Sequence, residues 1–126
     1  MKRSHFDKVM AFHTAFNIPI KNTPDASEPD RLALRTKLIK EEASELIEAL
    51  ENAYLPDIAH ELADLYIVLQ GTVLELGLQD VMDEAITKVN NSNMSKLGVD
   101  GKPVYRADGK VIKGSSYIKP DLSHLF

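Results

Sequence analysis

The chain has 126 residues, of which 44% are hydrophobic and 27% charged, and this composition is typical of one water-soluble globular domain. It has no cysteine, which excludes disulfide scaffolds and thiolate chemistry, and its net charge of -4 disfavours duplex nucleic acid as a partner. No apolar run approaches the roughly 20 residues of a membrane span, and the N-terminus lacks the apolar stretch of a secretory signal. We therefore expect a cytoplasmic protein that binds neither nucleic acid nor membranes.

Four helices are predicted in chain order, over about residues 4–17, 27–52, 56–76 and 80–93. Ser4 is the predicted N-cap of the first helix and forms a capping-box-like pair with Asp7. Ser27 is the predicted N-cap of the second, because Pro29 follows in the first turn, and Asp80 is that of the fourth. The third helix is apolar all round at residues 65–69, so we expect it to be covered on both sides.

The character of the chain changes after Leu97, where Gly, Pro and Asp residues typical of turns become frequent. Residues 104–106 and 111–113 flank Asp108-Gly109, so a small hairpin is expected there. An arm this short must pack on the helices or on a partner subunit. The predicted fold class is all-α, a four-to-five-helix bundle with a short irregular or hairpin C-terminal arm. We expect one domain over 1–126, with a helical core over about 4–97 and the arm over about 98–126.

Two glutamates of the second predicted helix fall among apolar residues. At about 100° per residue, six residues define one apolar arc: Leu34, Leu38, Ile39, Leu46, Ala49 and Leu50. Glu42 lies in the middle of this arc, and Glu45 lies within it. A buried carboxylate is unfavourable unless it has a proton, a basic partner or a metal ion.

The third predicted helix repeats this pattern with Glu61 and Asp64, which are again three residues apart and therefore share one helix face. Because a short loop joins the second and third helices, they should pack antiparallel, and the two acidic pairs could then converge. Four converging carboxylates repel one another, and a divalent cation removes this penalty. All-oxygen ligation favours magnesium, with manganese as the second choice, and suggests phosphoryl or pyrophosphoryl chemistry. An internal salt-bridge network is the alternative, because Arg31 and Arg35 lie on the same arc as Glu42.

The acidic residues also form a two-part sequence motif. Glu41-Glu42-Ala43-Ser44-Glu45 is followed, after fifteen residues, by Glu61-Leu62-Ala63-Asp64. This motif resembles the E-E-x-x-E … E-x-x-D signature of the MazG-like all-α NTP pyrophosphohydrolases. The tail resembles a subgroup similar to phosphoribosyl-ATP pyrophosphohydrolase, in three segments: residues 92–96, residues 109–113, and Tyr117 with residues 120–122.

The resemblance implies a magnesium-dependent nucleoside triphosphate pyrophosphohydrolase that cleaves between the α and β phosphates. The products would be a nucleoside monophosphate and pyrophosphate. It further implies a homodimer or dimer of dimers, with Glu41 as the base that orients or deprotonates the attacking water. The metal ligands that it implies are Glu42, Glu45, Glu61 and Asp64. Two alternatives stay open: a phosphoribosyl-ATP pyrophosphohydrolase, and a non-catalytic helical dimerisation module.

Candidate substrate contacts lie outside the acidic motif. Asn90 and Asn93 are near the end of the fourth predicted helix, and Lys96 lies just beyond it. Asn93 should point inward and, with Lys96, hold the phosphates or ribose. Lys113 and Tyr117 on the arm are expected to close over the polyphosphate, although basic tails are often simply solvated. His13, on the apolar stripe of the first helix, is either a core residue or a contact to the nucleoside. The preferred base stays open.

Overall fold

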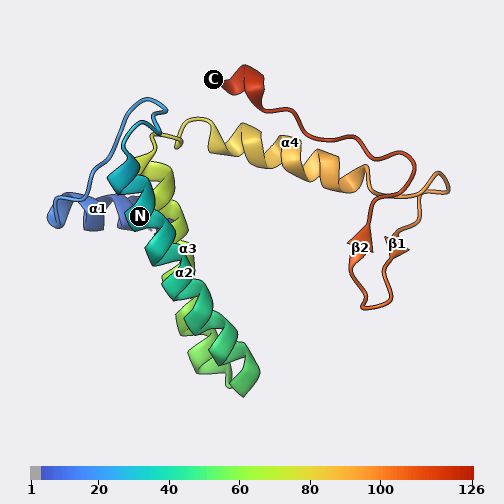
Figure 1. Cartoon of the computed structure of the whole chain (residues 1–126), viewed down its shortest axis with the longest axis horizontal. Helices are drawn as coiled ribbons and strands as arrows, with labels where there is room; N and C mark the ends of the chain where they lie inside the picture. The colour runs from blue at the N-terminus through green and yellow to red at the C-terminus, as the bar shows by residue number, and fades with distance from the viewer. Residues whose placement is uncertain (1–3) are drawn as a thin grey trace. The chain divides into compact units, whose positions relative to one another are not determined.

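The computed structural model describes residues 4–126, and this part of the chain is mostly helical (Figure 1). The elements are α1 (His5–Ala15), α2 (Pro29–Asn52), α3 (Leu55–Glu75), α4 (Met82–Met94), β1 (Val104–Tyr105), β2 (Val111–Ile112) and the short 3-10 helix η1 (Ser123–Leu125). The predicted fold class, all-α with a short C-terminal arm, is confirmed. None of the described helices is both long and apolar enough to cross a bilayer. The chain divides into two compact units, one ending at Gln79 and the other starting at Asp80.

The helix starts follow the predictions in part. Ser4 caps α1 as expected, since its Oγ accepts a hydrogen bond from the Asp7 amide at 3.1 Å. The prediction that Ser27 caps α2 is wrong, because the Asp25 carboxylate captures the Ser27 amide at 2.8 Å and the helix starts two residues later at Pro29. The Asp80 cap is also wrong, because α4 starts after Val81 and no side chain caps it.

The first unit is built on α2 and α3, which lie antiparallel and side by side (Figure 1). Asn52 ends α2 and Leu55 begins α3, so the reversal takes only two residues, and Ala53 adopts the left-handed conformation with φ of 57°. The amide of Ala53 donates to the carbonyl of Ala49 at 3.1 Å, which satisfies the end of α2. This tight turn sets the register in which the two helices face each other.

The core of the first unit contains a polar cluster where the helices meet. Arg31 and Arg35 of α2 both contact the Glu75 carboxylate of α3, whose side chain is only 1% exposed. Gly71 of α3 lies against Arg35 and against the buried His13 of α1. The buried apolar residues in the described chain are only three: Val9, Ala49 and Leu74. The cluster therefore fixes these helices to one another through ion pairs and hydrogen bonds.

The other side of α3 is open in this chain. Leu62, Tyr66 and Leu69 have exposed fractions of 50%, 59% and 45%. The prediction that this helix is covered on both sides is therefore wrong for the described part of the chain. α1 packs on α3 but has 11 residues against 21, so it cannot cover the full length of the longer helix.

The second unit pairs α4 with the C-terminal arm. Ser92 Oγ donates to the Ile118 carbonyl at 2.6 Å, and the Ile118 amide donates to Ser95 Oγ at 2.8 Å. Near the end of α4, the Gly114 amide donates to the Lys96 carbonyl at 2.8 Å. A Cβ at position 114 would lie 2.7 Å from the same carbonyl oxygen, so this approach requires glycine. The arm is therefore tied to α4 of its own chain.

The predicted hairpin in this arm is confirmed. β1 and β2 are antiparallel, with Val104 opposite Ile112 and Tyr105 opposite Val111. Each strand is one residue shorter than expected. β1 ends before Arg106, which belongs to the turn, where its amide donates to the Lys110 carbonyl at 2.7 Å. Gly109 supplies the positive φ of 90° that this turn needs.

Candidate metal centre

Four acidic side chains from α2 and α3 converge in the first unit. Glu42, Glu45, Glu61 and Asp64 each offer one carboxylate oxygen, and these oxygens lie within 4.8 Å of one another. The convergence follows from the i, i+3 spacing on each helix and from the antiparallel packing, which turns the two acidic faces toward each other. We call these four residues the acidic cluster. Its geometry is one in which a single ion could contact all four carboxylates.

Two residues of the acidic cluster have oxygens that lack partners. Glu42 Oε2 and Glu61 Oε2 are both buried, and neither has a hydrogen-bond partner among the described residues. Partial burial raises the pKa of Glu42, and the charges of Glu45, Asp64 and Glu61 raise it further. Burial and the adjacent Glu45 carboxyl likewise raise the pKa of Glu61. Carboxylates that are crowded and short of donors in this way fit a cation, which would satisfy the bare oxygens and offset the repulsion.

The salt-bridge alternative predicted basic partners for these acids from α2. Arg31 and Arg35 instead pair with Glu75: Arg31 Nε lies 2.7 Å from Oε1, and Arg35 Nη1 lies 2.8 Å from Oε2. Arg35 also donates to Thr72 Oγ1 at 3.0 Å and to the Val68 carbonyl at 2.7 Å. Both arginines are thus engaged away from Glu42, and the alternative in which they neutralise Glu42 is wrong.

One basic side chain does contact the acidic cluster, and it lies on α3 itself. His60 Nε2 is 3.1 Å from Asp64 Oδ2, with side-chain exposures of 68% and 38%. His60, Glu61 and Asp64 also bring one potential ligand atom each within 4.8 Å. His60 is not among the site residues predicted from the sequence. The available signal was its spacing, four residues before Asp64, which places both side chains on one face of a helix.

The predicted catalytic base, Glu41, lies on α2 next to Glu42 but does not belong to the acidic cluster. Its side chain is exposed, so it faces solvent at the rim. An exposed carboxylate beside a metal centre is free to accept a proton from water.

Two of the predicted substrate contacts of the second unit line a separate hollow. Asn93 and Lys96 line a cavity of about 380 Å³ whose other walls are Met94, Leu97, Pro103 and Val111. Asn90 and Asn93 are exposed, so the expectation that Asn93 points inward is wrong. Ser92 is the buried residue of this helical turn, because that face of α4 meets the arm.

The two arm residues lie against each other. Lys113 Nζ is 4.7 Å from the centroid of the Tyr117 ring, which is a cation–π contact.

From residue 88 to residue 119 the sequence has seven basic and only two acidic residues. This stretch therefore has the charge that a polyphosphate requires.

The sequence of the chain matches a known protein family. The family model described as phosphoribosyl-ATP pyrophosphohydrolase matches residues 9–93, more than half of the sequence. The chain belongs to this family. The match confirms the resemblance inferred from the acidic motif, because the family is part of the MazG-like superfamily. It also shows that the chain is a hydrolase acting on phosphoric anhydrides and supports a nucleotide as its substrate. No curated protein matches the chain at a significant level.

Within this family assignment, His13 is placed in the core. Its side chain is 2% exposed, and its Nδ1 donates to the Pro19 carbonyl at 3.3 Å. Burial lowers the pKa of His13 below its usual value, and the charge of Arg35 also lowers it, although the hydrogen bond to the Pro19 carbonyl acts in the opposite direction. Of the two roles considered for His13, the structure favours that of a buried, hydrogen-bonded core residue.

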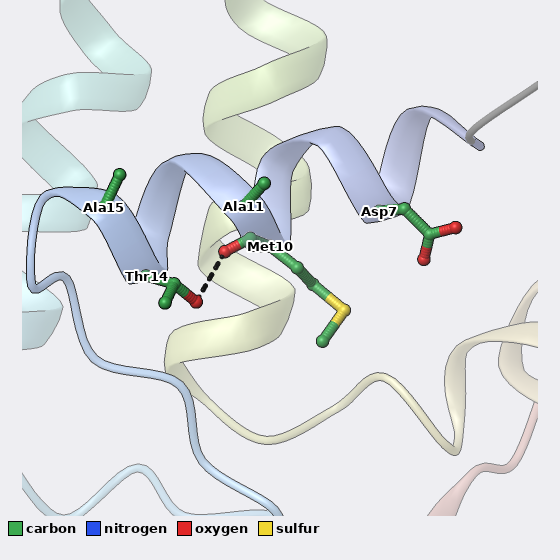
Figure 2. A pocket seen from close by; sticks show the side chains of 5 residues that line it. All are labelled: Asp7, Met10, Ala11, Thr14 and Ala15. Carbon is green, nitrogen blue, oxygen red and sulfur yellow. Dashed lines mark hydrogen bonds between the residues drawn. The ribbon is translucent and has the colours of Figure 1, made fainter.

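The outer face of α1 has a further hollow, of about 590 Å³ (Figure 2). Its lining residues are Asp7, Met10, Ala11, Thr14 and Ala15. The Thr14 hydroxyl is already used within the helix, where it donates to the Met10 carbonyl at 3.0 Å. The lining includes an acidic side chain and no cationic one, which makes this hollow unsuitable for a phosphorylated substrate.

Proposed function

We propose that this pyrophosphohydrolase is a magnesium-dependent enzyme that cleaves nucleoside triphosphates between the α and β phosphates. The observation that carries the proposal is the acidic cluster, in which four carboxylates converge and two buried oxygens lack donors. At the partly buried Glu42, Glu61 and Asp64, a purely structural bundle would be more stable with Leu or Ala, whereas Glu45 is exposed. Their presence therefore favours a metal-binding role.

Magnesium is the preferred ion, with manganese as the second choice, because the four cluster residues offer only oxygen. In this proposal Glu42, Glu45, Glu61 and Asp64 hold the metal. When bound, the ion supplies positive charge that neutralises the polyphosphate and the leaving oxygen.

The residues of the chain supply the proton transfer and the positioning. Glu41 orients the attacking water and accepts its proton as the oxygen adds to phosphorus. The bond to the bridging oxygen then breaks, which gives a nucleoside monophosphate and pyrophosphate. The exposed position of Glu41 on α2, directly beside Glu42, supports this role.

Substrate contacts are proposed for the second unit. Asn93 and Lys96 hold the phosphates or ribose, and their place in the lining of one cavity supports this role. Asn90, one turn earlier on α4, is proposed to contact the substrate with them. Lys113 and Tyr117 bind the polyphosphate from the arm, and the excess of basic residues in this stretch supports their role.

Phosphoribosyl-ATP is the second candidate substrate, because the matching family carries its name. Both substrates contain the same α–β anhydride, so the acidic cluster would serve either. The two candidate substrates differ in the part of the molecule outside the phosphate chain. A comparison of turnover on both substrates therefore distinguishes them.

The decisive experiment measures pyrophosphate release with magnesium over a panel of dNTPs, NTPs and phosphoribosyl-ATP. We expect turnover of simple triphosphates and its loss by at least about 100-fold in Glu45→Gln. Glu48→Gln, an exposed carboxylate on the same helix, is the matched control and should be fully active. Turnover of phosphoribosyl-ATP alone would favour the second candidate. Equal inactivity of wild type and Glu45→Gln on every substrate would contradict hydrolysis and favour a non-catalytic module.

We also propose that the protein is a homodimer or dimer of dimers. The α2–α3 hairpin exposes large apolar side chains near its turn, including Ile47 at 56%, Leu55 at 76% and Leu62 at 50%. Apolar surface of this kind on a soluble protein generally marks an interface. Light scattering at micromolar concentration should give a multiple of the 14.0 kDa chain mass, and a mass of 14.0 kDa would contradict the proposal.

A further inference from the structure

His60 contacts the acidic cluster without being part of its four-carboxylate geometry. Its Nε2 lies 3.1 Å from Asp64 Oδ2, a distance at which an imidazole N–H donates to a carboxylate. The contact joins residues one helical turn apart on α3, so the fold of the rest of the chain does not depend on it.

Asp64 differs from its neighbours in how it is held. Glu42 and Glu61 are partly buried, and each has one buried oxygen without a donor, whereas Glu45 is exposed. The Asp64 side chain is 38% exposed, and among the four acids it is the one that contacts a basic side chain, that of His60, in the described chain. Without His60, the Asp64 carboxylate would be free to rotate toward solvent.

We propose that His60 is a positioning residue that holds Asp64 Oδ2 and so turns the carboxylate toward the other three acids. The inference rests on the proposed metal centre. Carboxylate ligands of metal sites are generally oriented by such outer hydrogen bonds, and their loss typically weakens metal affinity by about 10- to 100-fold.

The experiment measures Mn²⁺ binding to the full chain by the electron paramagnetic resonance signal of free Mn²⁺. In His60→Ala we expect the dissociation constant to rise by about 10- to 100-fold. In His60→Gln we expect it to recover in part, because a glutamine amide can donate to an aspartate four residues on. His124→Ala is the matched control: it removes another exposed histidine, 3.5 Å from Glu84, and should bind Mn²⁺ like wild type.

Three further readings make the test selective. The melting temperature of the metal-free protein should be unchanged in His60→Ala, because the side chain is 68% exposed. At saturating metal the KM for nucleotide should match wild type, since His60 is not placed against the substrate. A direct ¹⁴N coupling to bound Mn²⁺ that disappears in His60→Ala would make His60 a ligand and overturn the positioning role.

The failure of this inference can be distinguished from failure of the proposed function. If wild type and His60→Ala bind Mn²⁺ equally well while Glu45→Gln does not, the metal centre stands and the role of His60 is refuted. If wild type itself does not bind Mn²⁺, the metal centre and the inference both fail.

Discussion

Arg35 Nη1 lies 2.8 Å from Glu75 Oε2, and both side chains are almost completely buried, at 7% and 1% exposure. The pair joins α2 to α3 at the end of the bundle where α1 also packs. Arg35 is therefore not a partner of the acidic cluster, in which Glu42 and Glu61 each have one buried oxygen that lacks a donor.

Removal of the Glu75 carboxylate should be strongly destabilising. Glu75→Ala leaves Arg35 buried with no counter-charge, and loss of one partner of a buried pair typically costs about 3–5 kcal/mol. The free energy of unfolding from urea titration measures this loss. Asp108→Asn, which removes an exposed partner of Arg106, is the control and should leave the free energy of unfolding close to that of wild type. A loss below about 1 kcal/mol in Glu75→Ala would show that the pair does not hold the helices together.

A methyl group at Gly71 should also disturb the buried polar cluster around Arg35. The added Cβ would lie 2.6 Å from Arg35 Nη2 and 2.7 Å from His13 Nε2, and both side chains are buried and hydrogen-bonded. Overpacking of this kind costs about 1–3 kcal/mol, against a gain in helix propensity of up to about 1 kcal/mol. We therefore expect a net loss of stability in Gly71→Ala, measured as a lower melting temperature. An unchanged or higher melting temperature would contradict the close packing.

Bound metal should raise the stability of the native protein. A ligand present at about 100 times its dissociation constant contributes about 2.7 kcal/mol if it binds only the folded state. Scanning calorimetry with and without magnesium should show the increase in wild type and in Glu48→Gln. Glu42→Gln should show little increase, because it lacks one carboxylate of the acidic cluster. The same increase in Glu42→Gln as in wild type would place the bound metal elsewhere.

Asp25 should make the stability depend on acid pH. Hydrogen bonds from Ser27 and from Lys21 lower the pKa of Asp25 to about 2 from 3.8. Because the folded-state pKa is depressed, this contribution is complete above pH 3.8 and is lost as the pH falls through about 2. The difference in unfolding free energy between wild type and Asp25→Asn should therefore shrink over this interval. A difference that stays constant from pH 5 to pH 2 would argue against the depressed pKa.

Ser95 should hold the arm on α4. Its Oγ accepts from the Ile118 amide at 2.8 Å and donates to the Ser92 carbonyl at 2.6 Å. Loss of a hydrogen bond worth about 1 kcal/mol should speed exchange of the Ile118 amide by about fivefold in Ser95→Ala. Hydrogen exchange followed by NMR measures this change. Ser116→Ala, an exposed serine of the same arm, should leave the exchange rate as in wild type.

Helical periodicity was sufficient to predict the acidic cluster. The i, i+3 spacing fixed the face of each pair, and the short connection between α2 and α3 fixed their antiparallel packing. These are local properties, since they depend on residues within a few positions of one another. The hairpin was predictable for the same reason, because Gly109 and the flanking apolar residues lie within one short segment.

Sequence pattern alone could not choose the partner of Arg35. In the sequence, Glu42 and Glu75 are both candidate partners for Arg35. The choice depends on how α3 packs on α2, because Arg35 and Glu75 are 40 residues apart. The N-caps predicted at Ser27 and Asp80 do not form, because the Ser27 amide binds the Asp25 carboxylate and α4 begins only after Val81. His13 is buried and Asn93 exposed because the packing of α1 on α3, and of the arm on α4, sets which face of each helix meets solvent. Contacts between distant segments depend on the sum of many weak packing energies. The residue pattern of a single helix therefore cannot predict them.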